Sequence, residues 1–154
     1  MEYGSIEREI HIDATPEVVY EVVSRPEHLR EWWPDEAELT PVTGATGVIT
    51  FGDKNSPEAT VVPLTVIEAD PPRRFSFRWV YDEGRTAAPD NSLLVTFELV
   101  PSGAGTLLRF SETGFREKGW EAAVLEEQYR EHVTGWDHFL PRLVAYVARV
   151  VSTR

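Results

Sequence analysis

Residues 126–151 of the chain read EEQYREHVTGWDHFLPRLVAYVARVV. Large apolar residues recur in this stretch at alternating steps of three and four, which is the spacing of one face of an α-helix. They are Tyr129, Val133, Trp136, Leu140, Leu143, Val147 and Val150. A helix over this stretch would be roughly 39 Å long, at 1.5 Å per residue. Such a helix needs a second apolar surface to cover its apolar stripe.

Two residues of this stretch are unfavourable inside a helix. Pro141 cannot donate a backbone hydrogen bond to the carbonyl of Asp137, which predicts a kink or a local break near Asp137–Pro141. Gly135 costs up to about 1 kcal/mol relative to alanine. We expect its missing side chain to offset this cost by letting the helix approach the sheet or the short helices closely.

The middle of the chain is typical of an antiparallel meander. Apolar and polar residues alternate there, as in strands with one buried face, and Phe75, Phe77 and Trp79 share such a face. Strands are predicted over residues 6–13, 37–42, 46–51, 59–69, 73–81, 92–100 and 106–115, with turn-forming stretches between them. Two short helices are predicted after the first strand. Thr15 and Pro16 begin the first, and Pro34 ends the second after Trp33.

The composition is that of a single folded domain covering residues 1–154. Of the 154 residues 42% are hydrophobic, and there is no cysteine, which excludes disulfides, thiol nucleophiles and cysteine-ligated zinc. A formal net charge of −11 disfavours nucleic acid and membrane surfaces as partners, because both are anionic. No apolar run is long enough to span a bilayer and no signal-peptide pattern is present, so we expect a cytoplasmic protein.

Several short motifs resemble those of a known superfamily. Residues 13–20, DATPEVVY, and 26–33, PEHLREWW, look like the opening of START-like (SRPBCC) proteins. Residues 70–75, DPPRRF, 105–106, GT, 113–115, TGF, and 135–136, GW, are similar to further landmarks in the expected order. Within the superfamily, the chain resembles bacterial homologues of the C-terminal domain of the heat-shock-protein-90 ATPase activator. The resemblance covers nearly the whole chain.

The resemblance implies an α+β protein with a helix-grip fold. A curved antiparallel sheet of about six or seven strands would wrap around the long C-terminal helix, with two short helices after the first strand. It also implies a cavity between the sheet and that helix, which opens near the short helices. The superfamily includes ligand binders, transporters and cyclase-like enzymes.

Bulky rings from the strands and helices supply the candidate site. A small-molecule pocket is usually lined by apolar groups with a few polar anchors and has a volume of roughly 300–1,000 Å³. The candidate ligand-binding residues are Trp32, Trp33, Trp79, Phe97, Phe110, Glu112, Tyr129, His132, Trp136 and Leu140. For each ring, the alternative is ordinary core packing.

Glu112 stands out among these candidates because it is a charged residue at a position where an apolar one is expected. It shares a strand face with Leu108 and Phe110, so the alternation places a carboxylate among apolar residues that face the helix. A buried carboxylate needs partners, and it could anchor a ligand hydroxyl or amine or act as a general acid or base. Alternatively, the strand bulges or ends early and exposes Glu112. Arg8 could pair with this carboxylate or extend to solvent at the sheet edge.

His132 and Tyr129 lie on or beside the apolar stripe of the closing helix. Each could offer a hydrogen bond to a ligand, or bond to a neighbouring residue instead. The chain has no Gly-x-Ser-x-Gly motif and none of the histidine spacings of a metal site, so we assign no catalytic residue, metal or cofactor.

Three functions remain open from the sequence. The first is binding of a small, mostly apolar or aromatic ligand in the cavity. The second is a protein-interaction module that contacts a chaperone. The third is an enzyme of the cyclase or dehydratase kind that uses Glu112 or His132. A monomer and a homodimer are both compatible with the sequence.

Overall fold

The computed structural model describes residues 3–53, 55–82 and 84–153. Seven strands form one antiparallel sheet in the order β1-β7-β6-β5-β4-β3-β2. The strands are β1 (Ser5–Ile12), β2 (Glu36–Glu38), β3 (Thr46–Phe51), β4 (Thr60–Asp70), β5 (Arg74–Trp79), β6 (Leu93–Ser102) and β7 (Gly105–Thr113). The helices are α1 (Pro16–Ser24), α2 (Pro26–Trp32) and α3 (Ala122–Ser152). The α+β helix-grip fold predicted from the sequence is confirmed.

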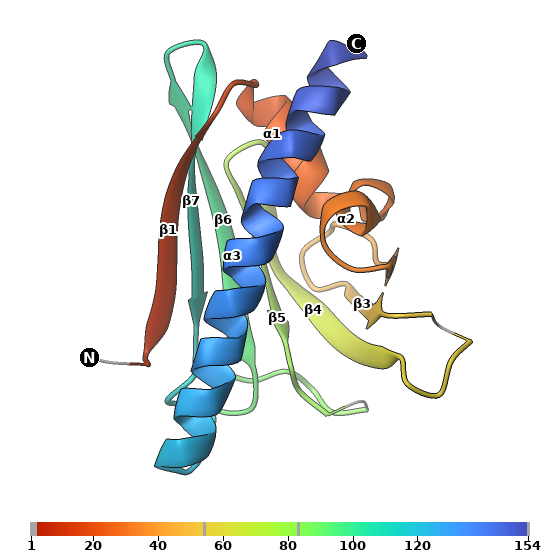
Figure 1. Ribbon diagram of the computed structural model, residues 1–154, viewed down its shortest axis with the longest axis vertical. Coiled ribbons are helices and arrows are strands. Elements are labelled where there is room, and N and C mark those ends of the chain that lie inside the picture. Colours follow the sequence, from red (N-terminus) through yellow and green to blue (C-terminus); the bar gives the residue numbers. More distant parts are fainter. Residues whose placement is uncertain (1–2, 54, 83, 154) are drawn as a thin grey trace.

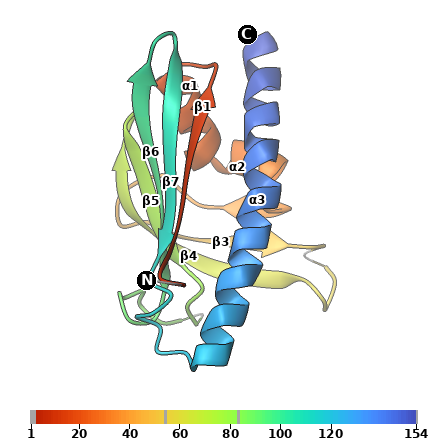
Figure 2. The ribbon, with the colours of Figure 1, turned by 60° about the vertical axis from the view of Figure 1, so that its left-hand side comes forward.

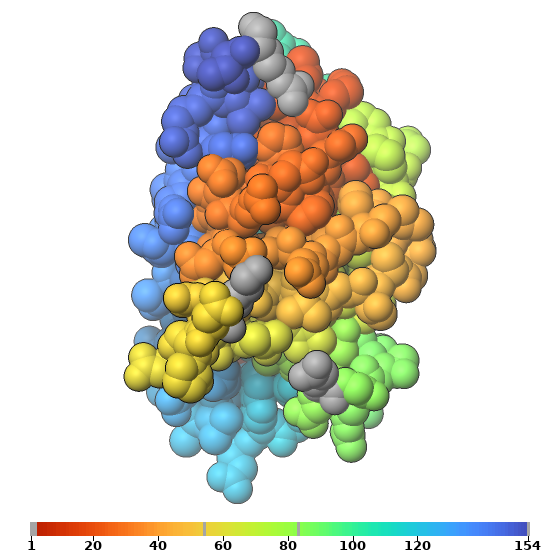
Figure 3. Space-filling model, turned by 90° about the vertical axis from the view of Figure 1, so that its right-hand side faces the viewer, coloured from red at the N-terminus to blue at the C-terminus, as the bar shows by residue number. Residues whose placement is uncertain are grey.

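The long helix α3 lies across one face of the curved sheet (Figure 1). The turned view shows the sheet and α3 as two layers (Figure 2). Both short helices pack against α3 as well as against their own neighbours. The space-filling view shows α1, α2 and the segment that follows them covering one side of the molecule, with α3 along the edge of that face (Figure 3).

Local sequence explains why the chain turns twice after β1. The Thr15 hydroxyl accepts a hydrogen bond from the backbone N–H of Val18 (3.4 Å), and proline begins both short helices. The Trp32 indole N–H donates to the carbonyl of Val22 (3.0 Å), which ties α2 to α1. These contacts place the paired tryptophans 32 and 33 beside α3.

The closing helix is longer and more regular than predicted. It begins at Ala122 and continues through Pro141 without interruption, so the predicted local break is wrong. The buried stripe of Trp136, Leu140, Leu143 and Val147 packs on the sheet and on the short helices on both sides of the proline. We attribute the continuity to this packing, which offsets the one missing backbone hydrogen bond. Among the described residues, no helix is both long and apolar enough to cross a membrane.

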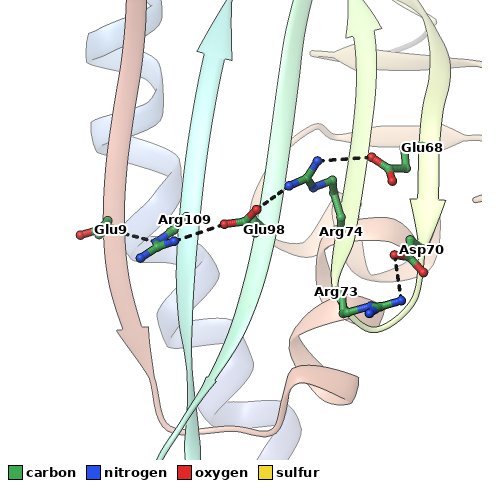
Figure 4. Close-up of polar contacts among 7 residues, drawn as sticks. All are labelled: Glu9, Glu68, Asp70, Arg73, Arg74, Glu98 and Arg109. Carbon is green, nitrogen blue, oxygen red and sulfur yellow. Dashed lines mark hydrogen bonds and ion pairs between the residues drawn. The ribbon is translucent and has the colours of Figure 1, made fainter.

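The face of the sheet that points away from α3 carries a ladder of paired charges. Glu9, Arg109, Glu98 and Arg74 lie directly opposite one another on β1, β7, β6 and β5, and ion pairs join each to the next (Figure 4). Arg74 also pairs with Glu68 of β4 (3.7 Å). Opposite charges at facing positions favour this register. The hydrogen bond from Arg74 holds the pKa of Glu98 below its ordinary value.

Candidate functional site

The carboxylate of Glu112 is fully buried between β7 and α3. Its Oε2 accepts a hydrogen bond from the Trp79 indole N–H (2.6 Å), and its Oε1 accepts one from the Trp136 indole N–H (2.9 Å). His132 Nδ1 lies 2.8 Å from the same Oε1. β7 continues to Thr113, so Glu112 is buried as its strand face predicts, and the alternative of an exposed carboxylate is wrong.

Sheet register and helix period bring these four side chains together. Glu112 lies opposite Val95 of β6, and Trp79 at the end of β5 reaches over β6 from the other side. His132 and Trp136 are four residues apart on α3, so their side chains lie on one face of that helix. The hydrogen bonds therefore connect β5, β7 and α3 through a single carboxylate.

These contacts satisfy a group that would otherwise be costly to bury. An indole N–H can only donate, so both carboxylate oxygens act as acceptors, as they do in the ionised form. Charge-assisted hydrogen bonds of this kind are stronger than neutral ones. Arg8 does not contribute to the cluster, because it pairs with Asp137 of α3 (3.0 Å). Glu112 thus connects β5, β7 and α3 through hydrogen bonds that do not involve Arg8.

A cleft of about 380 Å³ lies beside this network, between α3 and the sheet. It is lined by Trp33, Phe51, Trp79, Glu131, His132, Gly135, Trp136 and Phe139. The ring of Trp33 lies 5.0 Å from that of Trp79 and 5.1 Å from that of Trp136, so the aromatic walls support one another. A neighbouring cleft of about 450 Å³ shares Phe51, Trp79 and His132 with the first.

Gly135 keeps the α3 side of the first cleft open. A Cβ atom built at this position would meet no atom within 4 Å apart from its chain neighbours and the surrounding backbone of α3. The expectation that Gly135 lets α3 approach its neighbours closely is therefore wrong. The missing side chain leaves empty space, and that space belongs to the cleft.

His132 connects the buried carboxylate with the cleft. Its side chain is 14% exposed, whereas that of Glu112 is 0% exposed. Nδ1 faces Glu112, and Nε2 has no hydrogen-bond partner among the residues that the structure describes. One ring nitrogen of His132 is thus held in the interior, in a residue that also lines the cleft.

The structure divides the predicted site residues into three groups. Trp33, Trp79, His132 and Trp136 line the cleft, and Glu112 lies directly behind them. Trp32, Phe97 and Phe110 are core residues, with the rings of Phe97 and Phe110 5.5 Å apart. Tyr129 and Leu140 lie elsewhere on α3: the Tyr129 hydroxyl donates to the carbonyl of Ser5 (2.8 Å), and Leu140 lines a separate cleft of about 410 Å³ with Arg8 and Pro141.

Four residues that line the cleft were not among the predicted site residues, namely Phe51, Glu131, Gly135 and Phe139. Phe51 ends β3, and its ring packs 6.3 Å from that of Phe139 on α3. Phe139 follows Trp136 by three residues, a helical spacing that could have identified it as a neighbour on the same face. Glu131 precedes His132 and lies at the exposed rim. Within the described part of the chain, no group of three His, Cys, Asp or Glu side chains is arranged to hold a metal ion.

Comparison with solved structures supports the fold. The chain is similar to protein MLL2253 from Mesorhizobium loti, with 21% identity, a TM-score of 0.74 and coverage of 94% of this chain and 97% of the other. The Aha1 dimer from Colwellia psychrerythraea matches at 21% identity and a TM-score of 0.68, over 93% and 95%. CalU16 from Micromonospora echinospora matches at 20% identity and a TM-score of 0.65, over 99% and 83%.

Comparison with protein families gives the affiliation of the chain. No curated protein matches it. The family model described as activator of Hsp90 ATPase homolog 1-like protein matches residues 13–148. This range extends from the residue after β1 into the last turns of α3, and the resemblance read from the motifs is confirmed. The chain belongs to the family of activator of Hsp90 ATPase homolog 1-like proteins.

Proposed function

We propose that the cleft beside α3 binds a small, mostly aromatic or apolar molecule. The observation that carries this proposal is an opening of about 380 Å³ whose walls are mainly tryptophan and phenylalanine rings. Its volume falls within the roughly 300–1,000 Å³ that is usual for small-molecule sites. Flat rings on several sides suit a flat apolar ligand, because aromatic pairs prefer stacked or edge-to-face contacts.

The glycine at position 135 supports the same proposal. A glycine inside a helix costs about 0.8–1.0 kcal/mol relative to alanine. An alanine at this position would meet no steric obstacle. Retaining glycine therefore gives up stability and leaves room in the cleft, as expected where a ligand must enter.

Native mass spectrometry of freshly purified protein tests the proposal. We expect an excess mass that disappears on denaturation and that is missing from a Gly135→Leu variant, whose side chain would occupy part of the cleft. Thr134→Leu is the matched control, since Thr134 is exposed on the same helix and lines none of the clefts described. Equal excess mass in wild type and Gly135→Leu would place the ligand elsewhere. An apo mass together with no binding of added naphthalene would refute the proposal.

A second candidate is an enzyme of the polyketide-cyclase kind. The contact between Glu112 and His132 favours it, because a carboxylate that orients an imidazole is a common general-base arrangement. Such a base would accelerate exchange of deuterium into the methyl group of acetophenone in heavy water. Exchange at the buffer rate, or equal rates in wild type and folded His132→Gln, would exclude this activity.

A third candidate is contact with a chaperone in the cytoplasm. Only the family affiliation favours it. The test is stimulation of the ATPase of an Hsp90-type chaperone by the purified protein. Unchanged ATPase and no complex on gel filtration would exclude it.

A further inference from the structure

The hydrogen bonds of Glu112 indicate which ring nitrogen of His132 carries the proton. Oε1 accepts the Trp136 indole N–H and also lies 2.8 Å from His132 Nδ1. Oε2 accepts the Trp79 indole N–H, so both oxygens act as acceptors. We assign the contact with Nδ1 to a proton on that nitrogen, because an ionised carboxylate can only accept hydrogen bonds. In a neutral imidazole with its proton on Nδ1, Nε2 is a hydrogen-bond acceptor.

This acceptor is accessible from the cleft. Among the described residues, the hydroxyl of Tyr20 is the only fully buried side-chain polar atom without a partner. Nε2 of His132 also has no partner there, so it must have some exposed surface. His132 lines both the cleft of about 380 Å³ and its neighbour of about 450 Å³. A molecule in either cleft would therefore contact the His132 ring, and Nε2 is the ring nitrogen that is left to bond it.

The other charged groups around these clefts are less suited to contact a ligand among the rings. Glu131 is exposed on α3, at the rim of the first cleft. Lys118 lines only the second cleft, where its ammonium donates to the carbonyls of Val80 (2.8 Å) and Asn91 (3.1 Å). Asp82 is exposed and lies beside Lys118 in that cleft.

We infer that the ligand of this cleft is an aromatic molecule with an O–H or N–H group, such as a phenol, that donates to Nε2 of His132. This inference rests on the proposed function. It assigns Glu112 a positioning role, because its oxygens are occupied and it fixes the proton on the far side of the imidazole. A ligand without a donor would leave Nε2 desolvated and unpaired, and this would lower its binding affinity.

Three probes of nearly equal shape test the donor requirement in wild-type protein. They are 2-naphthol, which donates a hydrogen bond, 2-methoxynaphthalene, which can only accept one, and naphthalene, which does neither. Dissociation constants for the three probes are measured by NMR titration at one mildly alkaline pH. We expect 2-naphthol to bind about five- to tenfold more tightly than the other two.

The outcomes separate this inference from the proposed function. Binding of all three probes with similar constants would overturn the inference and leave the proposed function standing. A preference for both oxygen-bearing probes over naphthalene would mean that Nε2 carries the proton, which also overturns it. No binding of any probe would refute the proposed function and the inference with it.

Two further measurements, one on wild type and one on a His132 variant, test the same inference. The nitrogen-15 shifts of His132 in wild type should show the proton on Nδ1, and a proton on Nε2 would overturn the inference. In His132→Phe, checked for folding by circular dichroism, the advantage of 2-naphthol should vanish while naphthalene still binds. Full retention of that advantage in the folded variant would show that another group accepts the hydrogen bond.

Discussion

Replacing Gly135 should make the protein more stable and a worse binder at the same time. In Gly135→Ala the new methyl group enters open space, since a Cβ there meets no atom within 4 Å beyond its chain neighbours and the surrounding backbone of α3. The helix gains the difference in propensity between glycine and alanine, about 0.8–1.0 kcal/mol. For a domain of this size, such a gain raises Tm by about 2–4 °C.

Gly135→Leu tests how a larger side chain at the same position affects ligand binding. Leucine is nearly as good a helix former as alanine, so we expect a similar gain in stability. Its side chain would start from a residue that lines the cleft of about 380 Å³ and would take up part of that space. We expect the affinity for naphthalene to fall by a factor of about ten or more, since losing about 1.4 kcal/mol of contact is sufficient for this.

Chemical denaturation and calorimetric titration of the same samples measure the two effects. Thr134→Leu serves as the control, because it adds a leucine one residue away on the exposed side of α3. The control should bind naphthalene as wild type does. A destabilised Gly135→Ala would refute the claim that the space is empty, and wild-type affinity in Gly135→Leu would refute the claim that the ligand occupies it.

Three other substitutions test separate parts of the structure. Glu112→Gln should lower the free energy of unfolding by about 1–3 kcal/mol, because the amide nitrogen of the new glutamine cannot accept an indole or imidazole N–H. Glu127→Gln is the exposed control. A loss for Glu112→Gln no larger than that of the control would contradict the buried network. Tyr20→Phe should stabilise the protein by about 1 kcal/mol, because the buried hydroxyl of Tyr20 has no partner among the described residues. The same burial raises the pKa of Tyr20 to about 12, and a clear loss of stability on denaturation would argue against that environment. Glu98→Gln should lower stability by at most about 1 kcal/mol near neutral pH, since the pair with Arg74 is partly exposed. Arg74 lowers the folded-state pKa of Glu98, so this contribution is present above the ordinary carboxyl pKa and is lost as pH falls through the lower folded value. Denaturation curves of both proteins should therefore converge in acid, and a gap that stays constant with pH would contradict the ladder.

Much of the fold could be predicted because two simple periods describe it. Alternation at Phe75, Phe77 and Trp79 identified β5, and steps of three and four identified the buried stripe of α3. The ends of elements were less predictable, since β2 spans only Glu36–Glu38 where residues 37–42 were predicted. Pro141 was expected to kink or locally break α3, and the helix is not broken there, because propensity alone does not include the tertiary contacts on both sides of the proline.

Several residues of the candidate site could be predicted from the sequence, but the contacts between them could not. Strand parity gave the burial of Glu112, but its partners depend on register across three strands and on the rotation of α3. The sequence pattern cannot tell whether the space beside a glycine is filled or empty, and the prediction for Gly135 failed for this reason. Tyr129 lies on the predicted stripe, yet its hydroxyl bonds to the backbone of β1, a partner without a sequence signature.

Intermolecular NOEs between bound 2-naphthol and the protein would locate the ligand in the structure. We expect NOEs from the ligand ring to the α-protons of Gly135 and to the side chains of Phe139 and Trp33, which line one cleft. NOEs confined to the other clefts, such as the one beside Pro141 or the one lined by Val42 and Pro72, would contradict this expectation. The absence of any NOE at concentrations near the solubility of the ligand would contradict it as well.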